Sequence, residues 1–290
     1  MAAAVNPALS DLISAHKDHL EYSNCHLKEL AISEFLHQKN FPYMPVFFGT
    51  HSDQKREIYL LLQEFLKPEG LALINSENQP AAWNQNRIEN ALKSITEAHH
   101  HFAEIEAKET LNIPVFEPWN AVGLYRKLLA VIREEYADQN WNEALNELEE
   151  FLEKMQELKS DLNLPETIIH NDFNSRNVAI RTDETVCIYD WELALVNLPH
   201  RDVVEFLSFV LEEDFEAEKL QHFLQFHYQL AGKEYTREAW KEGYSYALKE
   251  YLVTRVSFYL VGSVVVKYDF AERVFRTGCR MLQFLNATSI

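Results

Sequence analysis

The sequence predicts an α+β fold with a small N-terminal lobe of few strands and a large, mostly helical C-terminal lobe. Apolar residues recur at helical spacing over most of the chain beyond residue 70, whereas β-branched and alternating runs are short. A break containing Pro and Gly separates the two kinds of pattern. The 290 residues, 47% of them hydrophobic, can fill a core in each lobe. We expect residues 1–66 to form the small lobe and residues 67–290 the large one.

Two helices are predicted to open the small lobe. Leu9, Leu12 and Ile13 lie at helical spacing within residues 7–20. A second helix is expected after Asn24, over about residues 26–38, because apolar residues share one of its faces. The residues of that face are Leu27, Leu30, Ala31 and Phe35.

A hairpin and a connecting segment are predicted to complete the small lobe. Two prolines end the helical stretch, and residues 46–48 and 57–62 then read as two strands around a polar turn over residues 50–56. The second strand leads into a segment broken by Pro and Gly. We expect the hinge between the lobes there, at about residues 63–68.

Three long amphipathic helices are predicted to open the large lobe, because apolar residues keep helical phase in three stretches. Runs of β-branched residues then predict short strands at 167–169, 177–180 and 185–189, with residues 170–177 on a loop. From Val203 onward the pattern is helical again. The helical positions are Trp83, Ile88, Ala91, Leu92, Ile95, Phe102 and Ile105 in the first stretch, Leu124, Leu128, Val131 and Ile132 in the second, and Ala144, Leu145, Leu148, Phe151, Leu152, Met155 and Leu158 in the third.

Charge and cysteine content restrict the partners and the compartment. The net charge of -18 repels a nucleic-acid backbone or an anionic membrane surface, so we expect neither as a partner. This negative charge is compatible with a neutral or cationic small molecule as the partner. Cys25, Cys187 and Cys279 are widely spaced and form no metal-binding pattern, which predicts a reducing cytoplasm rather than a disulfide framework.

Two other conspicuous segments have structural interpretations. The most apolar run, Tyr251 to Val266, contains Arg255 and is shorter than a membrane span, so a buried helix is expected. The run His99-His100-His101 lies within a predicted helix, where consecutive residues point in different directions. We therefore expect a helix surface with one packed histidine, not a metal site.

One stretch brings together the groups that phosphoryl transfer requires. Ile169-His170-Asn171-Asp172 supplies a carboxylate, Asn177 follows five residues later, and Asp190 ends the next apolar run. A carboxylate can orient an attacking hydroxyl, and an amide oxygen with a second carboxylate can hold a magnesium ion that neutralises nucleotide phosphates. The stretch therefore predicts phosphoryl transfer.

This HxDxxxxN loop, followed by an apolar strand that ends in Asp, resembles the aminoglycoside phosphotransferase and choline kinase family, a branch of the protein-kinase-like fold. The run Tyr59 to Phe65 looks like the strand and nucleotide-binding hinge of that family. Asp202 is similar to the Asp that is expected to brace the catalytic loop. The resemblance covers roughly residues 26–210.

The resemblance implies a role for each matching residue. Asp172 would be the catalytic base and His170 would order the loop, while Asn177 and Asp190 would bind magnesium. Glu192 lies on the same side of an extended chain as Asp190 and could reach a second magnesium ion. The implied cofactors are Mg²⁺ and ATP or GTP. The nucleotide would bind near the hinge residues Gln63, Glu64, Phe65 and Leu66, and near the helix glutamate Glu29.

The small lobe departs from the pattern of this family. No glycine occurs before Gly49, which excludes a Gly-rich phosphate loop from that region. Glu29, or less well Glu34, fits the helix glutamate, but no strand carries its lysine partner. Lys17 and Lys28 are the nearest lysines, and both are predicted on helix surfaces.

Three functions remain open on this basis. The leading hypothesis is an ATP- and magnesium-dependent phosphotransferase that acts on the hydroxyl of a small molecule. The alternative is a catalytically impaired kinase-like protein that binds a nucleotide or a partner protein. A third reading, metal-assisted hydrolysis by His170, Asp172 and Asp190, has only one histidine beside the carboxylates.

Overall fold

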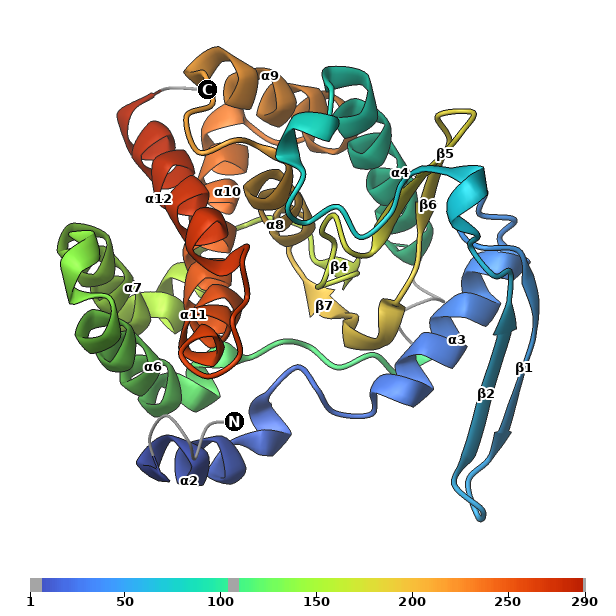
Figure 1. The fold of residues 1–290 in the computed structure, drawn as a ribbon, viewed down its shortest axis with the longest axis horizontal. Helices are drawn as coiled ribbons and strands as arrows, with labels where there is room; N and C mark the ends of the chain where they lie inside the picture. Colours follow the sequence, from blue (N-terminus) through green and yellow to red (C-terminus); the bar gives the residue numbers. More distant parts are fainter. Residues whose placement is uncertain (1–6, 104–109, 289–290) are drawn as a thin grey trace.

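The computed structural model describes residues 7–103 and 110–288, so the predicted helical position Ile105 lies outside it. Figure 1 shows a two-stranded hairpin projecting from one side of a larger body in which helices surround short strands. Strands β1 (Phe47–Asp53) and β2 (Ile58–Gln63) pair antiparallel in that hairpin. The described residues thus combine a mostly helical part with few strands.

The two N-terminal helices pack against different parts of the molecule. Helix α3 (Cys25–Gln38) packs on the hairpin, with the His26 ring 4.2 Å from the Tyr59 ring. Helix α2 (Pro7–Ala15) instead packs against α6 (Val122–Glu135) of the larger body. The segment between these helices, which includes the 3₁₀ turn Lys17–His19, therefore passes from the body to the hairpin side.

The hairpin is longer than predicted and leaves an apolar surface exposed. The first strand continues to Asp53. Its backbone pairs with β2 from Gly49 opposite Leu62 to Asp53 opposite Ile58. Such backbone hydrogen bonds do not require apolar side chains. Phe48 is 69% exposed, and Phe65, just beyond the second strand, is 76% exposed. The other exposed apolar residues on this part of the chain are Val46, Ile58, Leu60 and Leu62.

The predicted helices α4 (Gln85–Ala103), α6 and α7 (Asn142–Asp161) are all confirmed. Helix α4 begins two residues after Trp83, the first position of the apolar pattern, because the Asn84 side chain accepts a hydrogen bond from the Arg87 N–H at 3.0 Å. Trp83 therefore precedes the helix, and its ring packs against Phe206. The apolar stripes of these helices fill the core of the larger body.

Two small antiparallel sheets present the predicted loop. Strand β4 (Thr167–Ile169) pairs with β7 (Leu195–Asn197), and β5 (Val178–Arg181) lies between β3 (Leu71–Leu73) and β6 (Val186–Ile188). Residues 170–177 connect β4 to β5, as predicted. Strands β3 and β7 were not predicted, since three residues give too little alternation to identify.

The C-terminal part is helical, as predicted. Residues of the apolar run Tyr251–Val261 are largely buried, whereas Val264, Val265 and Val266 are exposed. No helix among the described residues is long and apolar enough to span a membrane. The helices are α8 (His200–Val210), α9 (Ala217–His227), α10 (Arg237–Tyr251), α11 (Ser257–Ser263) and α12 (Ala271–Ala287), with π turns at Tyr228–Gly232 and Leu252–Val256.

Candidate active site

The carboxylate of Asp172 lies at the centre of the loop between β4 and β5. Its Oδ2 accepts a hydrogen bond from Asn177 Nδ2 at 2.6 Å, and its Oδ1 accepts one from Asn174 Nδ2 at 3.0 Å. The guanidinium groups of Arg255 and Arg176 each approach Oδ1 to 3.4 Å. The side chain is only 13% exposed. Burial alone would raise the pKa of Asp172, but the charges of Arg255 and then Arg176 hold that pKa below its ordinary value.

His170 orders the backbone next to Asp172. Its Nε2–H donates to the Tyr189 carbonyl oxygen at 2.9 Å, and its Nδ1 accepts from the Asp172 N–H at 3.3 Å. The ring packs on Trp191, with centroids 4.5 Å apart. Both ring nitrogens are therefore engaged by the protein, which suits a residue that holds the loop rather than one that exchanges protons.

Asp202, on the buried helix α8, holds the start of the loop. Its carboxylate accepts the backbone N–H groups of His170 and Asn171, both at 2.8 Å, and the His99 ring nitrogen at 2.9 Å. The prediction that Asp202 braces this loop is confirmed. His99 is the packed histidine of the His99–His101 run, while His100 is exposed.

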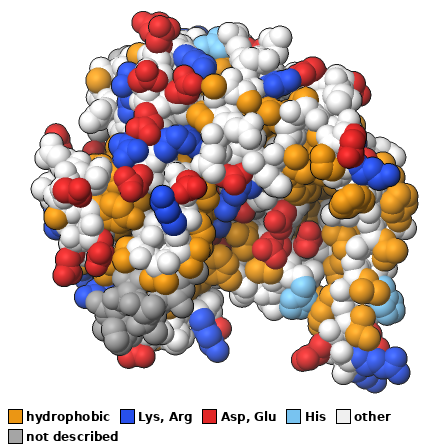
Figure 2. Space-filling model, viewed as in Figure 1, with side chains coloured by type: hydrophobic (Ala, Val, Ile, Leu, Met, Phe, Trp, Pro, Cys, Tyr) orange, Lys and Arg blue, Asp and Glu red, His pale blue; other side chains and the backbone are white. Residues whose placement is uncertain are grey.

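The carboxylates of Glu29, Asp190 and Glu192 form a group beside the loop that carries Asp172. Among the described residues, no group donates a hydrogen bond to the carboxylates of Glu29, Asp190 or Glu192. Burial raises the pKa of Asp190, and the Asp172 carboxylate adds to that increase. Burial and then the charges of Asp190 and Glu192 raise the pKa of Glu29 to about 7. Figure 2 shows acidic side chains gathered in a hollow between the hairpin side and the larger body.

These residues fit a magnesium ion that is completed by other ligands. Asn177 Nδ2 donates to both Asp172 Oδ2 and the Asp172 carbonyl, at 2.6 and 2.9 Å, so its oxygen is directed away from Asp172. The Asp190 carboxylate accepts no hydrogen bond from any residue that the structure describes, and its backbone takes the left-handed conformation with a φ of 67°. No three His, Cys, Asp or Glu residues form a metal site within the described ranges. Magnesium is usually held by one or two carboxylates together with phosphates and water.

The predicted hinge residues have mixed environments. Both carboxylate oxygens of Glu64 accept hydrogen bonds from Arg181 on β5, at 2.8 and 2.7 Å, and those bonds lower the pKa of Glu64 to about 2. The Glu64 side chain therefore ties the connecting segment to the larger body. Gln63 and Phe65 are exposed, and Leu66 is half-buried.

The prediction that Lys28 lies on a helix surface is wrong. Its side chain is 4% exposed, and its ammonium group donates to the Glu21 carbonyl oxygen at 3.0 Å. The buried residues of α3 include Leu30 of the predicted face, but burial extends past that face to Lys28, Ile32 and Leu36. Lys17 and Glu34 are exposed, and Glu34 accepts a hydrogen bond from Thr50.

Two arginines near Asp172 are held by contacts with distant parts of the chain. Arg176 packs against later helices, with its guanidinium 2.9 Å from the Tyr259 hydroxyl and over the rings of Phe209 and Phe270. Arg255 comes from the π turn Leu252–Val256 and was not predicted in the site. The one sequence signal for it is an arginine inside the most apolar run of the chain.

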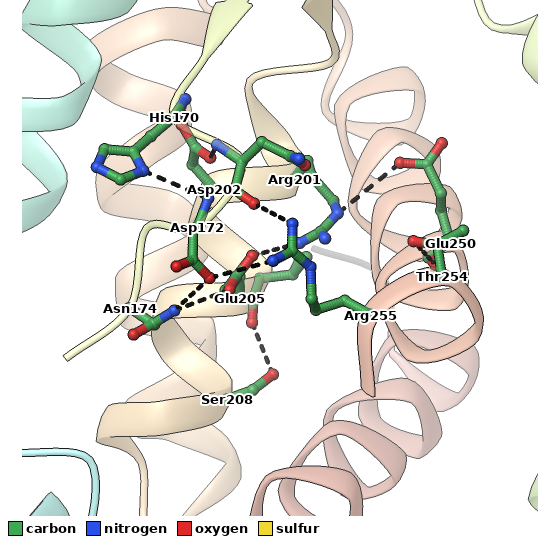
Figure 3. Close-up of polar contacts among 12 residues, drawn as sticks. His170, Asp172, Asn174, Arg201, Asp202, Glu205, Ser208, Glu250, Thr254 and Arg255 are labelled. Carbon is green, nitrogen blue, oxygen red and sulfur yellow. Dashed lines mark hydrogen bonds and ion pairs between the residues drawn. The ribbon is translucent and has the colours of Figure 1, made fainter. Parts of the chain in front are cut away.

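A buried network continues from Asp172 into the helical core (Figure 3). Asn174 Nδ2 donates both to Asp172 and to Glu205 Oε1, the latter at 3.0 Å. Glu205 also accepts from Arg201 Nη1 at 2.6 Å, and both of these side chains are fully buried. Burial raises the pKa of Glu205 to about 7. The sequence indicated this pair only through the four-residue spacing of Arg201 and Glu205 on α8.

Comparisons with known proteins identify a family and a fold. A model described as the phosphotransferase enzyme family matches residues 16–240. No curated protein sequence matches significantly. Similar solved structures include the AMP complex of a spectinomycin phosphotransferase (14% identity, TM-score 0.59, 91% of this chain and 84% of that one). They also include the choline kinase of Streptococcus pneumoniae (13%, 0.54, 91% and 81%) and the GDP and kanamycin complex of APH(2″)-IIIa (12%, 0.54, 92% and 86%). At these identities the likeness concerns the fold, and it confirms the predicted two-lobed, kinase-like class.

Proposed function

The chain belongs to the phosphotransferase enzyme family, and from this premise we propose that it transfers a phosphoryl group from ATP or GTP to the hydroxyl of a small molecule. One observation carries the proposal. The Asp172 carboxylate is held ionised and hydrogen-bonded to Asn177, close to an Asp190 carboxylate that has no donor among the described residues. We propose that these three side chains supply the base and two oxygen ligands for a cation.

Each residue of this set has a distinct role in the proposed reaction. Asp172 accepts a hydrogen bond from the acceptor hydroxyl, orients it and takes its proton as the new oxygen–phosphorus bond forms and the bond from the γ-phosphorus to the departing nucleoside diphosphate breaks. The oxygens of Asn177 and Asp190 would hold Mg²⁺, with Glu192 as a further ligand. When bound, the ion neutralises charge on the transferred phosphoryl group. His170 and Asp202 keep the loop in place while the substrates bind.

The nucleotide is proposed to bind between the hinge segment, at about residues 63–68, and the acidic hollow. Gln63 and Phe65 are exposed and Leu66 is half-buried, so this segment is proposed to present backbone groups to a base, whereas the Glu64 side chain is occupied by Arg181. The similar spectinomycin phosphotransferase was solved with AMP, and APH(2″)-IIIa with GDP. These relatives support a nucleotide, with either base.

A cationic alcohol is the proposed class of acceptor. The net charge of -18 and the group of carboxylates near Asp172 favour a positively charged molecule over an anionic one. A choline kinase is among the proteins of similar fold. Cys25, Cys187 and Cys279 form no disulfide, which supports the proposal of a reducing cytoplasm.

Thermal unfolding with and without Mg-ATP or Mg-GTP tests the proposal. Either nucleotide should raise the melting temperature of the wild-type chain, and Asp190→Ala should abolish that increase. Asp161→Ala, at an exposed position, is the matched control and should keep it. Asp172→Asn should keep the increase but lose phosphoryl transfer. A wild-type chain whose melting temperature ignores both nucleotides would count heavily against the proposal.

A catalytically impaired, nucleotide-binding protein is the second candidate. It is favoured by Glu29, which has no ammonium partner among the described residues, while Lys28 points to the Glu21 carbonyl. This candidate predicts that Mg-ATP binds but that no phosphate reaches water or any member of a panel of amino alcohols and sugars. Transfer to any of these acceptors would refute it.

A further inference from the structure

Arg255 contacts both the backbone and the carboxylate of the loop that carries Asp172. Its guanidinium donates to the Asn171 carbonyl oxygen at 2.9 Å and approaches Asp172 Oδ1 to 3.4 Å. It also forms an ion pair with the Glu21 carboxylate. The Arg255 side chain is 3% exposed. One buried cation therefore joins the loop to the segment that precedes α3.

The position of Arg255 depends on an irregular turn of its helix. Residues Leu252–Val256 form a π turn between α10 and α11, and such turns are rare and often occur at functional sites. The hydroxyls of Thr254 and Ser257 donate to carbonyl oxygens four residues earlier, at 2.8 and 2.5 Å. Figure 3 shows Arg255 reaching from these helices toward Asp172.

Glu21 and Asp172 both pair with the Arg255 guanidinium. A buried guanidinium needs a compensating negative charge, and the ion pair with Glu21 is closer than the contact with Asp172. Without Glu21, Asp172 would be the nearest carboxylate to Arg255, and a closer pair would draw Oδ1, which already accepts a hydrogen bond from Asn174 at 3.0 Å, out of its present orientation. Glu21 therefore keeps the Arg255–Asp172 contact long, while Asn177 fixes the other oxygen at 2.6 Å.

We propose that Arg255 is a positioning residue, which holds Asn171 and Asp172 in the orientation that meets the acceptor hydroxyl, and that Glu21 holds Arg255 in place. The inference rests on the proposed phosphotransferase function and assigns roles to two residues outside the loop motif. Neither residue needs to touch the nucleotide, so their effect belongs to the turnover step.

Steady-state kinetics of Arg255→Met, Arg255→Lys and Glu21→Gln tests the proposal. Arg255→Met should lower kcat by roughly a hundredfold, since a misplacement of about 1 Å costs that much, with the nucleotide KM unchanged within about twofold. Arg255→Lys keeps the charge but cannot bridge Asn171 and Asp172 equally well, so it should restore part of kcat. Arg273→Met is the control and should keep kcat, because its guanidinium donates to the carbonyls of Phe209 and Glu77 and to no loop residue among those described.

Several outcomes would overturn the proposal. An unchanged kcat in Arg255→Met, or a higher nucleotide KM at constant kcat, would show that Arg255 does not position the base. If Arg255→Met does not fold, Glu21→Gln provides the same test, because glutamine keeps the shape of the glutamate side chain and one hydrogen-bond acceptor. It should then lower kcat at constant KM, and an unaltered kcat refutes the inference.

A second measurement separates this inference from the proposed function. A wild-type chain without transfer activity would refute the proposed function. In that case urea unfolding still tests the contact between Arg255 and Asp172. The midpoint changes caused by Asp172→Asn and Arg255→Met should not add in the double variant, because the two side chains interact. Additive changes would overturn the positioning contact itself.

Discussion

Replacing Glu29 by Gln should remove a pH-dependent loss of stability from the chain. The Glu29 carboxyl is half-buried on α3, beside Asp190 and Glu192. Burial and then those two negative charges raise its pKa from the ordinary value of 4.5 to about 7. The folded chain therefore binds a proton at Glu29 more tightly than the unfolded chain does.

The sign and size of the effect follow from this difference. As the pH rises from 4.5 to about 7, the unfolded state loses its proton freely while the folded state retains it at a growing cost, so stability falls. The difference between the two pKa values corresponds to roughly 3 kcal/mol. Because Glu29 is only half-buried and solvent screens its charge, we expect about 1–2 kcal/mol.

Urea unfolding of the wild type and Glu29→Gln at pH 5 and pH 8, in low salt without magnesium, measures the effect. The free energy of unfolding of the variant should exceed that of the wild type by about 1–2 kcal/mol more at pH 8 than at pH 5. Glu34→Gln, at an exposed position on the same helix, should show no such change. A difference that stays the same at both pH values would refute the reasoning.

Two further predictions concern the packing around the loop. Glu205→Ala leaves the buried Arg201 without its 2.6 Å partner and should lower the free energy of unfolding by about 3–5 kcal/mol; a loss below about 1 kcal/mol in urea titration would contradict the buried pair. At Gly243 an added Cβ would lie 2.7 Å from His200 Nε2, so Gly243→Ala should cost about 1–3 kcal/mol. At Gly123 no heavy atom lies within 4 Å of an added Cβ, and Gly123→Ala should stabilise α6 by about 0.5–1 kcal/mol. Equal midpoints for the two glycine variants would contradict the close approach of His200.

The sequence predicts features that depend on local pattern. Helices α4, α6 and α7 follow from long apolar stripes, and the loop residues His170, Asp172 and Asn177 follow from their spacing. Helical phase cannot identify which face a distant segment will cover, and for that reason the buried position of Lys28 was missed.

Contacts between residues that are far apart in the sequence could not be predicted from local patterns either. Arg255 meets Glu21 across more than two hundred positions, and no local signal pairs the two residues. The Glu205 contact with the loop depends equally on where α8 packs. Spacing identified the groups that could do chemistry, whereas tertiary packing decides how those groups are held.

The exposed apolar side of the hairpin has a consequence for how the protein behaves in concentrated solution. Ile58, Leu60 and Leu62 alternate along β2, whose second edge pairs with no other strand among the described residues. Such an edge invites pairing between molecules, while the net charge of -18 keeps molecules apart. Salt shortens the reach of that repulsion to about 8 Å at physiological ionic strength. Colloidal stability should therefore decrease as salt is added, the reverse of what a surface rich in opposite-charge attractions would give.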